Sequence, residues 1–96
     1  MVTLIATLNV KEGKMEEAIE LLKEIVQKVR ATEPGCKAYI PHTVSGKKNA
    51  NKIVFYEKYA DKEALTIHSN NLAKNFEKLF PILEPGMDIM TCTEII

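Results

Sequence analysis

The sequence predicts a single α+β domain in which two helices cover one face of a four-stranded antiparallel sheet. Three observations lead to this fold class. Four short segments are rich in β-branched or alternating apolar residues, and two longer segments repeat apolar residues at three-and-four spacing. These segments follow one another in the order β-α-β-β-α-β. The length of 96 residues fits one domain over residues 1–96.

The first half of the chain begins with a strand over residues 2–10 and continues with a long amphipathic helix. From Met15 to Val29 apolar residues recur on one helical face, with Glu and Lys residues between them. Gly13 marks the turn before this helix, and Glu33-Pro34-Gly35 ends it. Residues 36–44 form the second strand, in which Pro41 indicates an edge position or an irregularity.

The second half of the chain also contains a strand, a helix and a strand, but it begins with a loop. Polar residues 45–51 predict a hairpin loop that leads to a third strand over residues 53–59. Asp61 is the expected N-cap of a second helix, and the polar residues 69–71 indicate a break in it. Residues 87–95 form the last strand. Two βαβ units joined by a hairpin give the ferredoxin-like fold.

Both faces of the predicted sheet carry bulky apolar residues. Leu4 and Ile5 point to opposite faces of the first strand, as do Phe55 and Val54 in the third. A face that met only water would be more polar. We therefore expect a homodimer that packs sheet to sheet through the faces without helices. The alternative is a monomer with a mildly apolar exposed sheet.

Charge and hydropathy exclude several classes of partner. The chain has 13 Lys and Arg residues against 13 Asp and Glu residues and a pI of about 6.7, so it lacks the basic surplus of a nucleic-acid-binding protein. No apolar segment reaches bilayer length, and residues 1–10 lack the features of a signal peptide, so we expect no membrane association and a cytoplasmic location. Cys36 and Cys92 are expected to be free thiols, with a disulfide as the alternative.

His68 is the first candidate for chemistry, because helical spacing places it on the apolar face of the second helix. A neutral imidazole beside a pocket can take a proton from a weak acid near neutral pH. The alternative is a core histidine bonded to a backbone carbonyl. The strand residues Tyr39, Tyr56 and Tyr59 are candidates for binding an oxygenated aromatic substrate, with core packing as the alternative. His42 is expected at the surface.

Motifs for cofactors are absent from the sequence. His42 and His68 have no HxxE or CxxC partners at ligand spacing, so we predict no metal site. The chain has no GxGxxG or GxxxxGK[ST] motif, which argues against a nucleotide cofactor. It has no GxSxG motif either, which argues against an α/β-hydrolase.

The run from Glu57 to His68 matches the pattern E-x-[WY]-x-[DS]-x-x-A-x-x-x-H. Together with the turn at residues 11–14 and the helix end at residues 33–36, it makes nearly the whole chain resemble the antibiotic biosynthesis monooxygenase family of dimeric ferredoxin-like proteins. This resemblance implies a sheet-to-sheet dimer and, in each subunit, a pocket between the sheet and the second helical region. It also implies that His68 is the helical histidine and Tyr59 the aromatic residue at the end of the third strand.

The resemblance implies more than one activity. Some members oxidise quinols or polyketide phenols with O2 and no metal or flavin, others break down haem, and one relative isomerises a phosphorylated sugar derivative. Many members have a second histidine where this chain has Ala73. Haem-degrading members have asparagine, tryptophan and histidine at or near the positions of Ala6, Tyr59 and Leu79, so haem breakdown is not expected.

The function we expect from the sequence is therefore a monooxygenase without a cofactor, acting on a small phenolic or quinol substrate and O2 with His68 as the base. One alternative is an isomerase of a small carbonyl metabolite, in which His68 moves a proton. The other is a dimer that binds a small ligand without turning it over.

Overall fold

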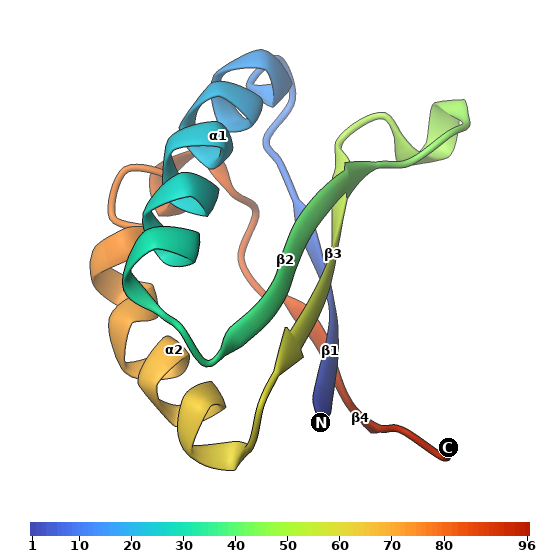
Figure 1. Ribbon diagram of the computed structural model, residues 1–96. Coiled ribbons are helices and arrows are strands. Elements are labelled where there is room, and N and C mark those ends of the chain that lie inside the picture. Colours follow the sequence, from blue (N-terminus) through green and yellow to red (C-terminus); the bar gives the residue numbers. More distant parts are fainter.

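The computed structural model describes residues 1–96 and has the predicted α+β, ferredoxin-like order of elements (Figure 1). The helices are α1 (Met15–Thr32) and α2 (Lys62–Asn75), and two short 3₁₀ turns, η1 (Lys47–Asn49) and η2 (Phe80–Ile82), lie in the connections. The strands are β1 (Val2–Asn9), β2 (Cys36–Thr43), β3 (Lys52–Tyr59) and β4 (Asp88–Thr93).

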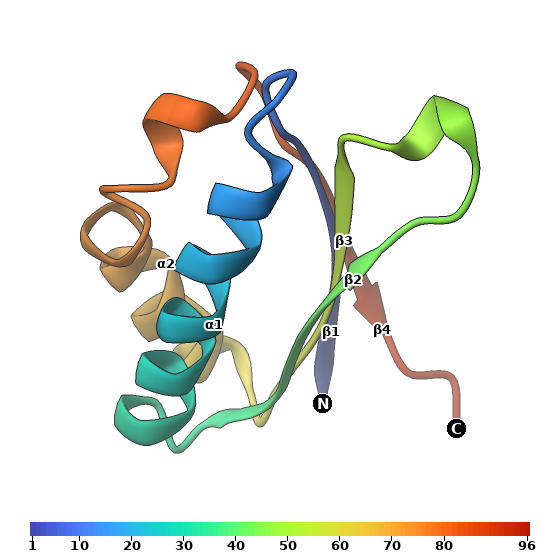
Figure 2. The same ribbon diagram turned by 90° about the horizontal axis from the view of Figure 1, so that it is seen from above.

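The four strands form one antiparallel sheet in the order β2-β3-β1-β4. Strand β2 is thus an edge strand, which confirms the prediction made from Pro41. The register of β2 shifts between Cys36 and Ala38, several residues before the proline. Both helices lie on the same side of the sheet (Figure 2). No helix combines the length and the hydropathy needed to cross a bilayer.

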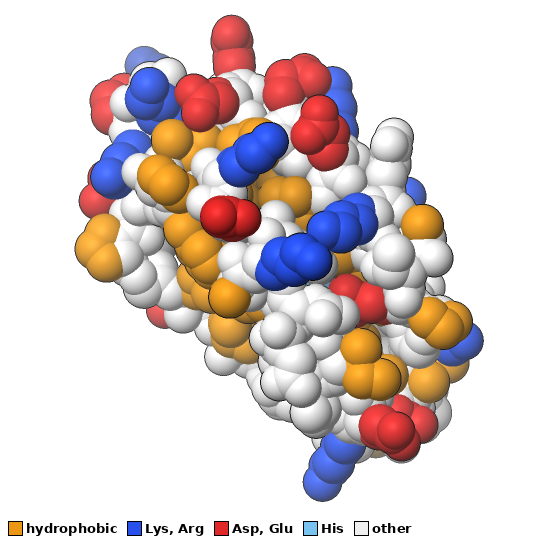
Figure 3. Space-filling view, turned by 90° about the vertical axis from the view of Figure 1, so that its left-hand side faces the viewer, with side chains coloured by type: hydrophobic (Ala, Val, Ile, Leu, Met, Phe, Trp, Pro, Cys, Tyr) orange, Lys and Arg blue, Asp and Glu red, His pale blue; other side chains and the backbone are white.

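The core fills the space between the helices and the sheet. Alternate residues of β1 and β3 face the helices and are buried, and the apolar stripe of α1 packs onto them, as its three-and-four spacing predicts. The outer side of the helix layer carries Lys, Arg, Asp and Glu side chains of both signs with apolar patches between them (Figure 3). The core residues from these three elements are Ala6, Leu8, Ile53, Phe55, Ala18, Leu22, Ile25, Val26 and Val29.

Helix α2 runs without a break, so the interruption predicted at residues 69–71 is wrong. These three polar residues are exposed, while His68 and, directly after the helix, Phe76 are buried against the core. Packing of the inner face therefore overrides the weak helix propensity of Ser and Asn. The predicted N-cap is confirmed, because Asp61 Oδ1 accepts a hydrogen bond from the Ala64 N–H at 2.8 Å.

The opposite face of the sheet has no helix over it (Figure 2). The strand register places Ile40 opposite Tyr56, Tyr56 opposite Ile5, and Ile5 opposite Met90. These four side chains form an apolar row that crosses all four strands. Ile40, Tyr56 and Met90 expose 40%, 36% and 59% of their surface.

The two cysteines lie on the edge strands β2 and β4 and are free, as the sequence predicted. Two strands separate them, which is too far for a disulfide. Burial raises the pKa of the Cys36 thiol to about 11, and the neighbouring carboxyl groups of Glu33 and Glu57 add to this effect. Cys36 is therefore a neutral thiol at physiological pH.

Replacing Asp61 with alanine tests the cap of α2. The change removes the acceptor for the Ala64 N–H, so we expect the free energy of unfolding to fall by about 1 kcal/mol. Chemical denaturation measures this loss. Glu63→Ala in the same helical turn is the control and should cost about half a kcal/mol or less, because Glu63 is exposed and makes no cap. Equal losses for the two variants would contradict this account.

Candidate functional site

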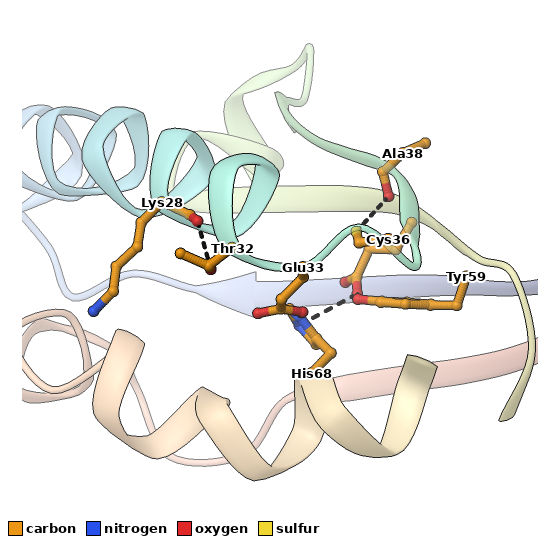
Figure 4. A network of polar contacts seen from close by, with 8 residues as sticks. Lys28, Thr32, Glu33, Cys36, Ala38, Tyr59 and His68 are labelled. Carbon is orange, nitrogen blue, oxygen red and sulfur yellow. Dashed lines mark hydrogen bonds and ion pairs between the residues drawn. The ribbon is translucent and has the colours of Figure 1, made fainter. Parts of the chain in front are cut away.

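Beneath the helices lies a cluster of polar side chains that come from three parts of the chain. Glu33 follows α1, Glu57 and Tyr59 lie on β3, and His68 lies on α2. Figure 4 shows His68 reaching up from α2 toward Glu33, with the Tyr59 hydroxyl directed to the same cluster. Glu33, Glu57 and His68 are each only 4% exposed and are the only buried charged or strongly polar residues.

The imidazole of His68 lies between two carboxyl groups. Its Nδ1 is 2.8 Å from Glu33 Oε1, and its Nε2 is 3.8 Å from Glu57 Oε1. A carboxylate can only accept a hydrogen bond, so Nδ1 carries the hydrogen and donates it to Glu33. In the neutral ring, Nε2 then carries the lone pair. The partner of His68 is therefore a carboxylate and not the backbone carbonyl of the alternative hypothesis.

Two of the three predicted tyrosines pack against His68. The Tyr39 ring meets the imidazole edge-on with centroids 5.0 Å apart, and the Tyr59 ring lies 5.2 Å away. The structure does not bring Tyr56 to this cluster, because Tyr56 belongs to the apolar row on the other face of the sheet. His42 is exposed, as expected, and lies beside the Val54 carbonyl oxygen.

Glu57 is held by Tyr59, whose hydroxyl donates a hydrogen bond to Oε1 at 2.5 Å. Burial raises the pKa of Glu57, and the charge of Glu33 acts in the same direction, while Tyr59 and His68 oppose the rise. Burial and the adjacent Glu57 charge also raise the pKa values of Tyr39 and Tyr59, so both stay neutral phenols. Glu57 in this cluster therefore stays neutral up to a higher pH than an exposed glutamate does.

Sequence reasoning missed both glutamates as site residues. Glu57 stands in a run of alternate buried positions on β3, with Phe55 before it and Tyr59 after it, so its parity was a usable signal. The sequence contains no such signal for Glu33, because this residue lies at the predicted end of a helix and its partner His68 lies 35 residues away. Its second oxygen, Oε2, is buried and has no hydrogen-bond partner.

A small cavity of about 60 Å³ lies between α2 and the sheet, beside His68 and Glu57. Its wall is otherwise apolar apart from Ser69 and the Tyr39 ring, and it contains no Lys or Arg. A larger groove of about 380 Å³ between α1 and β2 includes none of the buried polar cluster, so the chemistry belongs to the smaller cavity. The cavity is lined by Leu4, Ala6, Leu8, Tyr39, Phe55, Glu57, His68, Ser69, Leu72, Phe76, Met87 and Ile89.

Gly35 allows the two halves of the site to meet. The Ala60 N–H donates to the Gly35 carbonyl oxygen at 2.8 Å, which fastens the turn after α1 to the start of α2. A side chain on Gly35 would put its Cβ only 2.6 Å from the Ala64 Cβ. The absence of a side chain thus lets α2 approach closely enough for Glu33 to reach His68 one turn later.

The arrangement has the form of a general base with an orienting group. A histidine whose one nitrogen is bonded to a carboxylate presents the other nitrogen in a fixed tautomer and position. Glu33 also stabilises the imidazolium that forms when Nε2 takes a proton. No group of three or more His, Cys, Asp or Glu side chains is arranged to hold a metal ion.

Comparison with known proteins identifies a family and several solved structures that this chain resembles. The model of the antibiotic biosynthesis monooxygenase family matches residues 1–77. No curated protein matches the chain. Among solved structures, a candidate antibiotic biosynthesis monooxygenase from Caulobacter crescentus CB15 has a TM-score of 0.85 and 24% identity over 99% of this chain and 90% of its own, which shows the fold.

Two further solved structures are similar over most of their length. One, described as an antibiotic biosynthesis monooxygenase, has a TM-score of 0.79 and 26% identity, with all of both chains covered. The other, protein SO0527 from Shewanella oneidensis, has a TM-score of 0.78 and 25% identity over 95% of this chain and 87% of its own.

The close approach at Gly35 can be tested with a pair of substitutions. Gly35→Ala should lower the free energy of unfolding by about 1–3 kcal/mol, because the new methyl group overlaps Ala64. Adding Ala64→Gly should recover part of the loss, although glycine within a helix costs about 1 kcal/mol by itself. A double-mutant cycle from urea denaturation measures the coupling, and simple additivity of the two changes would contradict the proposed contact.

Proposed function

Because this chain belongs to the antibiotic biosynthesis monooxygenase family, we propose that it is a cofactor-independent monooxygenase that oxidises a small phenolic or quinol substrate with O2. One observation carries the proposal. The buried His68 has its Nδ1 bonded to Glu33 and lines an apolar cavity that also contains Glu57. This is the geometry that a base needs to remove a proton from a weakly acidic hydroxyl group.

In the proposed reaction, Nε2 of His68 takes the proton of a substrate hydroxyl, and the resulting anion is electron-rich enough to reduce O2. For a hydroquinone, one oxygen atom enters the ring and the other leaves as water, so the products are a hydroxyquinone and water. The imidazolium is paired with Glu33 at 2.8 Å until it returns its proton to the reduced oxygen. The apolar wall keeps water away from the anion.

The charge of the cavity favours a neutral substrate. Its wall offers no Lys or Arg to pair with a phosphate or carboxylate, and the carboxylate of nearby Glu33 disfavours a further negative group. A neutral phenol fits this setting better than a phosphorylated carbonyl metabolite, which makes the isomerase the weaker alternative. At about 60 Å³ the cavity is smaller than the roughly 150 Å³ that accepts benzene, so the substrate must displace wall side chains, and Met87 is a flexible one.

We also propose that the chain forms a homodimer through the apolar row of Ile5, Ile40, Tyr56 and Met90. The row crosses all four strands, and no helix covers it. A second copy presenting the same row would remove it from water without any other partner. A cytoplasmic location remains a prediction.

Replacing His68 with alanine tests the base directly. General-base help contributes about 10²–10⁴-fold to a rate, so we expect oxygen uptake with hydroquinones to fall by that factor. The variant also leaves Glu33 without its partner, which should cost about 1–3 kcal/mol of stability. Oxygen-electrode assays and thermal melts on the same preparation separate the two effects. A variant that loses stability but keeps its specific activity would rule His68 out as the base.

His42→Ala is the matched control, because His42 is the other histidine of the chain, is exposed and does not line the cavity beside His68. It should keep wild-type oxygen uptake.

Two further measurements on the wild type address the alternatives. Exchange of solvent deuterium into a carbonyl substrate without oxygen uptake would favour the isomerase. A phenol that raises the melting temperature but is never oxidised would favour a ligand-binding protein.

The dimer is tested by placing a charge in the apolar row. Ile5→Glu would bury an unpaired carboxylate in the proposed interface, at a cost of several kcal/mol, so the protein should sediment as a monomer at micromolar concentration. The same glutamate at Lys47, in the exposed loop, should leave the sedimentation coefficient unchanged. A wild type that is monomeric at every concentration would disprove the dimer.

A further inference from the structure

We propose that Glu57 is a second catalytic residue, which donates a hydrogen bond from its neutral carboxyl group to the oxyanion that His68 creates on the substrate. This inference rests on the function proposed above and assigns a separate task to each of the two glutamates. Glu33 is the ionised partner of the base, and Glu57 is the neutral partner of the substrate.

The distances leave a position for a substrate oxygen. His68 Nε2 and Glu57 Oε1 are 3.8 Å apart, which is too far for a direct hydrogen bond. The space beside Nε2 and the Glu57 carboxyl group is therefore free for a substrate oxygen that accepts a hydrogen bond from this carboxyl group. Both residues line the cavity, so a hydroxyl group at its polar end can meet His68 and Glu57 together.

Tyr59 determines which oxygen of the Glu57 carboxyl group accepts a hydrogen bond and which can donate one. The Tyr59 hydroxyl donates to Oε1, which makes Oε1 the acceptor of the carboxyl group. No other side-chain hydrogen bond reaches the Glu57 carboxyl group, so Oε2 is the oxygen that can carry a hydrogen and offer it to a ligand. Because Tyr59 is two residues further along the same strand and is completely buried, it holds the carboxyl in place.

The surrounding charges favour this assignment. The titratable groups that face Glu57 are Tyr59 on its own strand, Cys36 and Tyr39 on β2, Glu33 in the turn after α1, and His68 on α2. His68 is the only one of them that can become a cation, and it is bonded to Glu33 at 2.8 Å and not to Glu57. A second carboxylate here would be a buried charge without a counterion, which is costly. Burial accordingly raises the pKa of Glu57.

Every proton in the proposed step is accounted for. His68 Nε2 takes the hydroxyl proton, the substrate becomes an anion, and Glu57 keeps its own proton throughout. The oxyanion then lies between an imidazolium and a carboxylic acid, in a cavity where water cannot solvate it. Fixed donors aimed at a developing negative charge are among the largest contributions to catalysis, and a buried neutral carboxylic acid can act as such a donor.

Two substitutions at Glu57 test the inference. Glu57→Gln keeps an N–H donor of the same size, so kcat/KM for a hydroquinone should stay within about tenfold of the wild type. Glu57→Leu removes the donor and should lower kcat/KM by about 10²–10³-fold. Wild-type activity should also fall as the pH rises through the raised pKa of Glu57, and this fall should be absent in Glu57→Gln. Equal large losses in both variants would show that Glu57 acts as a carboxylate and overturn the proposal.

A binding measurement separates this inference from the monooxygenase proposal. The phenolate of 4-nitrophenol absorbs visible light, so its binding can be followed without oxygen. We expect the wild type and Glu57→Gln to bind the phenolate alike and Glu57→Leu to bind it at least tenfold more weakly. Equal affinity in all three would overturn the proposal. If this order holds but the wild type consumes no oxygen, the monooxygenase proposal fails and the role of Glu57 stands. Should Glu57→Leu not fold, a loss of activity with rising pH that Glu57→Gln retains overturns the proposal instead.

Discussion

The hydrogen bond between Glu33 and His68 joins the end of α1 to the middle of α2, and the inner architecture of the domain is arranged around it. Both side chains are buried, so neither can exchange its partner for water. Losing one partner leaves the other polar and unsatisfied, which costs more than the bond itself contributes. The Tyr39 and Tyr59 rings enclose the imidazole, and Gly35 permits the approach of the helices that the bond requires. The second oxygen of Glu33, Oε2, is buried as well and has no hydrogen-bond partner within the chain.

Much of the fold followed from local patterns. Alternation and three-and-four spacing predicted all four strands and both helices, and Asp61 was a correct helix start because capping depends on neighbours in sequence. The predicted break in α2 is wrong because its polar residues are exposed to solvent within a continuous helix, and the packing of the inner face, which local propensity does not include, decides the helix. In β3 both faces carry apolar residues, so alternation gave the shared parity of Phe55, Glu57 and Tyr59 but not which of the two faces meets the helices.

The candidate site was less accessible to prediction for a related reason. Its position on a helical face predicted His68, and the matched motif predicted Tyr59. Glu33 could be identified only from the folded structure, because its partner is remote in sequence and its neighbours in sequence are typical of a helix end. A polar pair that is distant in sequence produces no periodic pattern. A candidate catalytic residue is therefore easier to predict from the sequence than the hydrogen-bonded groups that orient it.

Strand β3 serves both faces of the sheet. Glu57 and Tyr59 point toward the buried cluster, while Tyr56, which lies between them in sequence, joins the apolar row on the other side. The proposed dimer face and the proposed site are thus separated by the thickness of one backbone layer. A change of register in this strand would exchange the two sets of side chains, so the correct pairing of β3 is a condition for both.

The helix layer ends before it reaches the edge of the sheet. Ala6 on β1 is 6% exposed, whereas Ile89, its partner on β4 facing the same side, is 49% exposed and also lines the cavity. Only side chains, and no backbone element, therefore close the cavity along β4. Passage of a small molecule along this border requires rotamer changes in Ile89 and Met87, which take picoseconds to nanoseconds at exposed positions, and no hinge movement of a loop or domain. Access along this edge would then be controlled by the size of two side chains, and a single substitution there could alter how quickly ligands exchange.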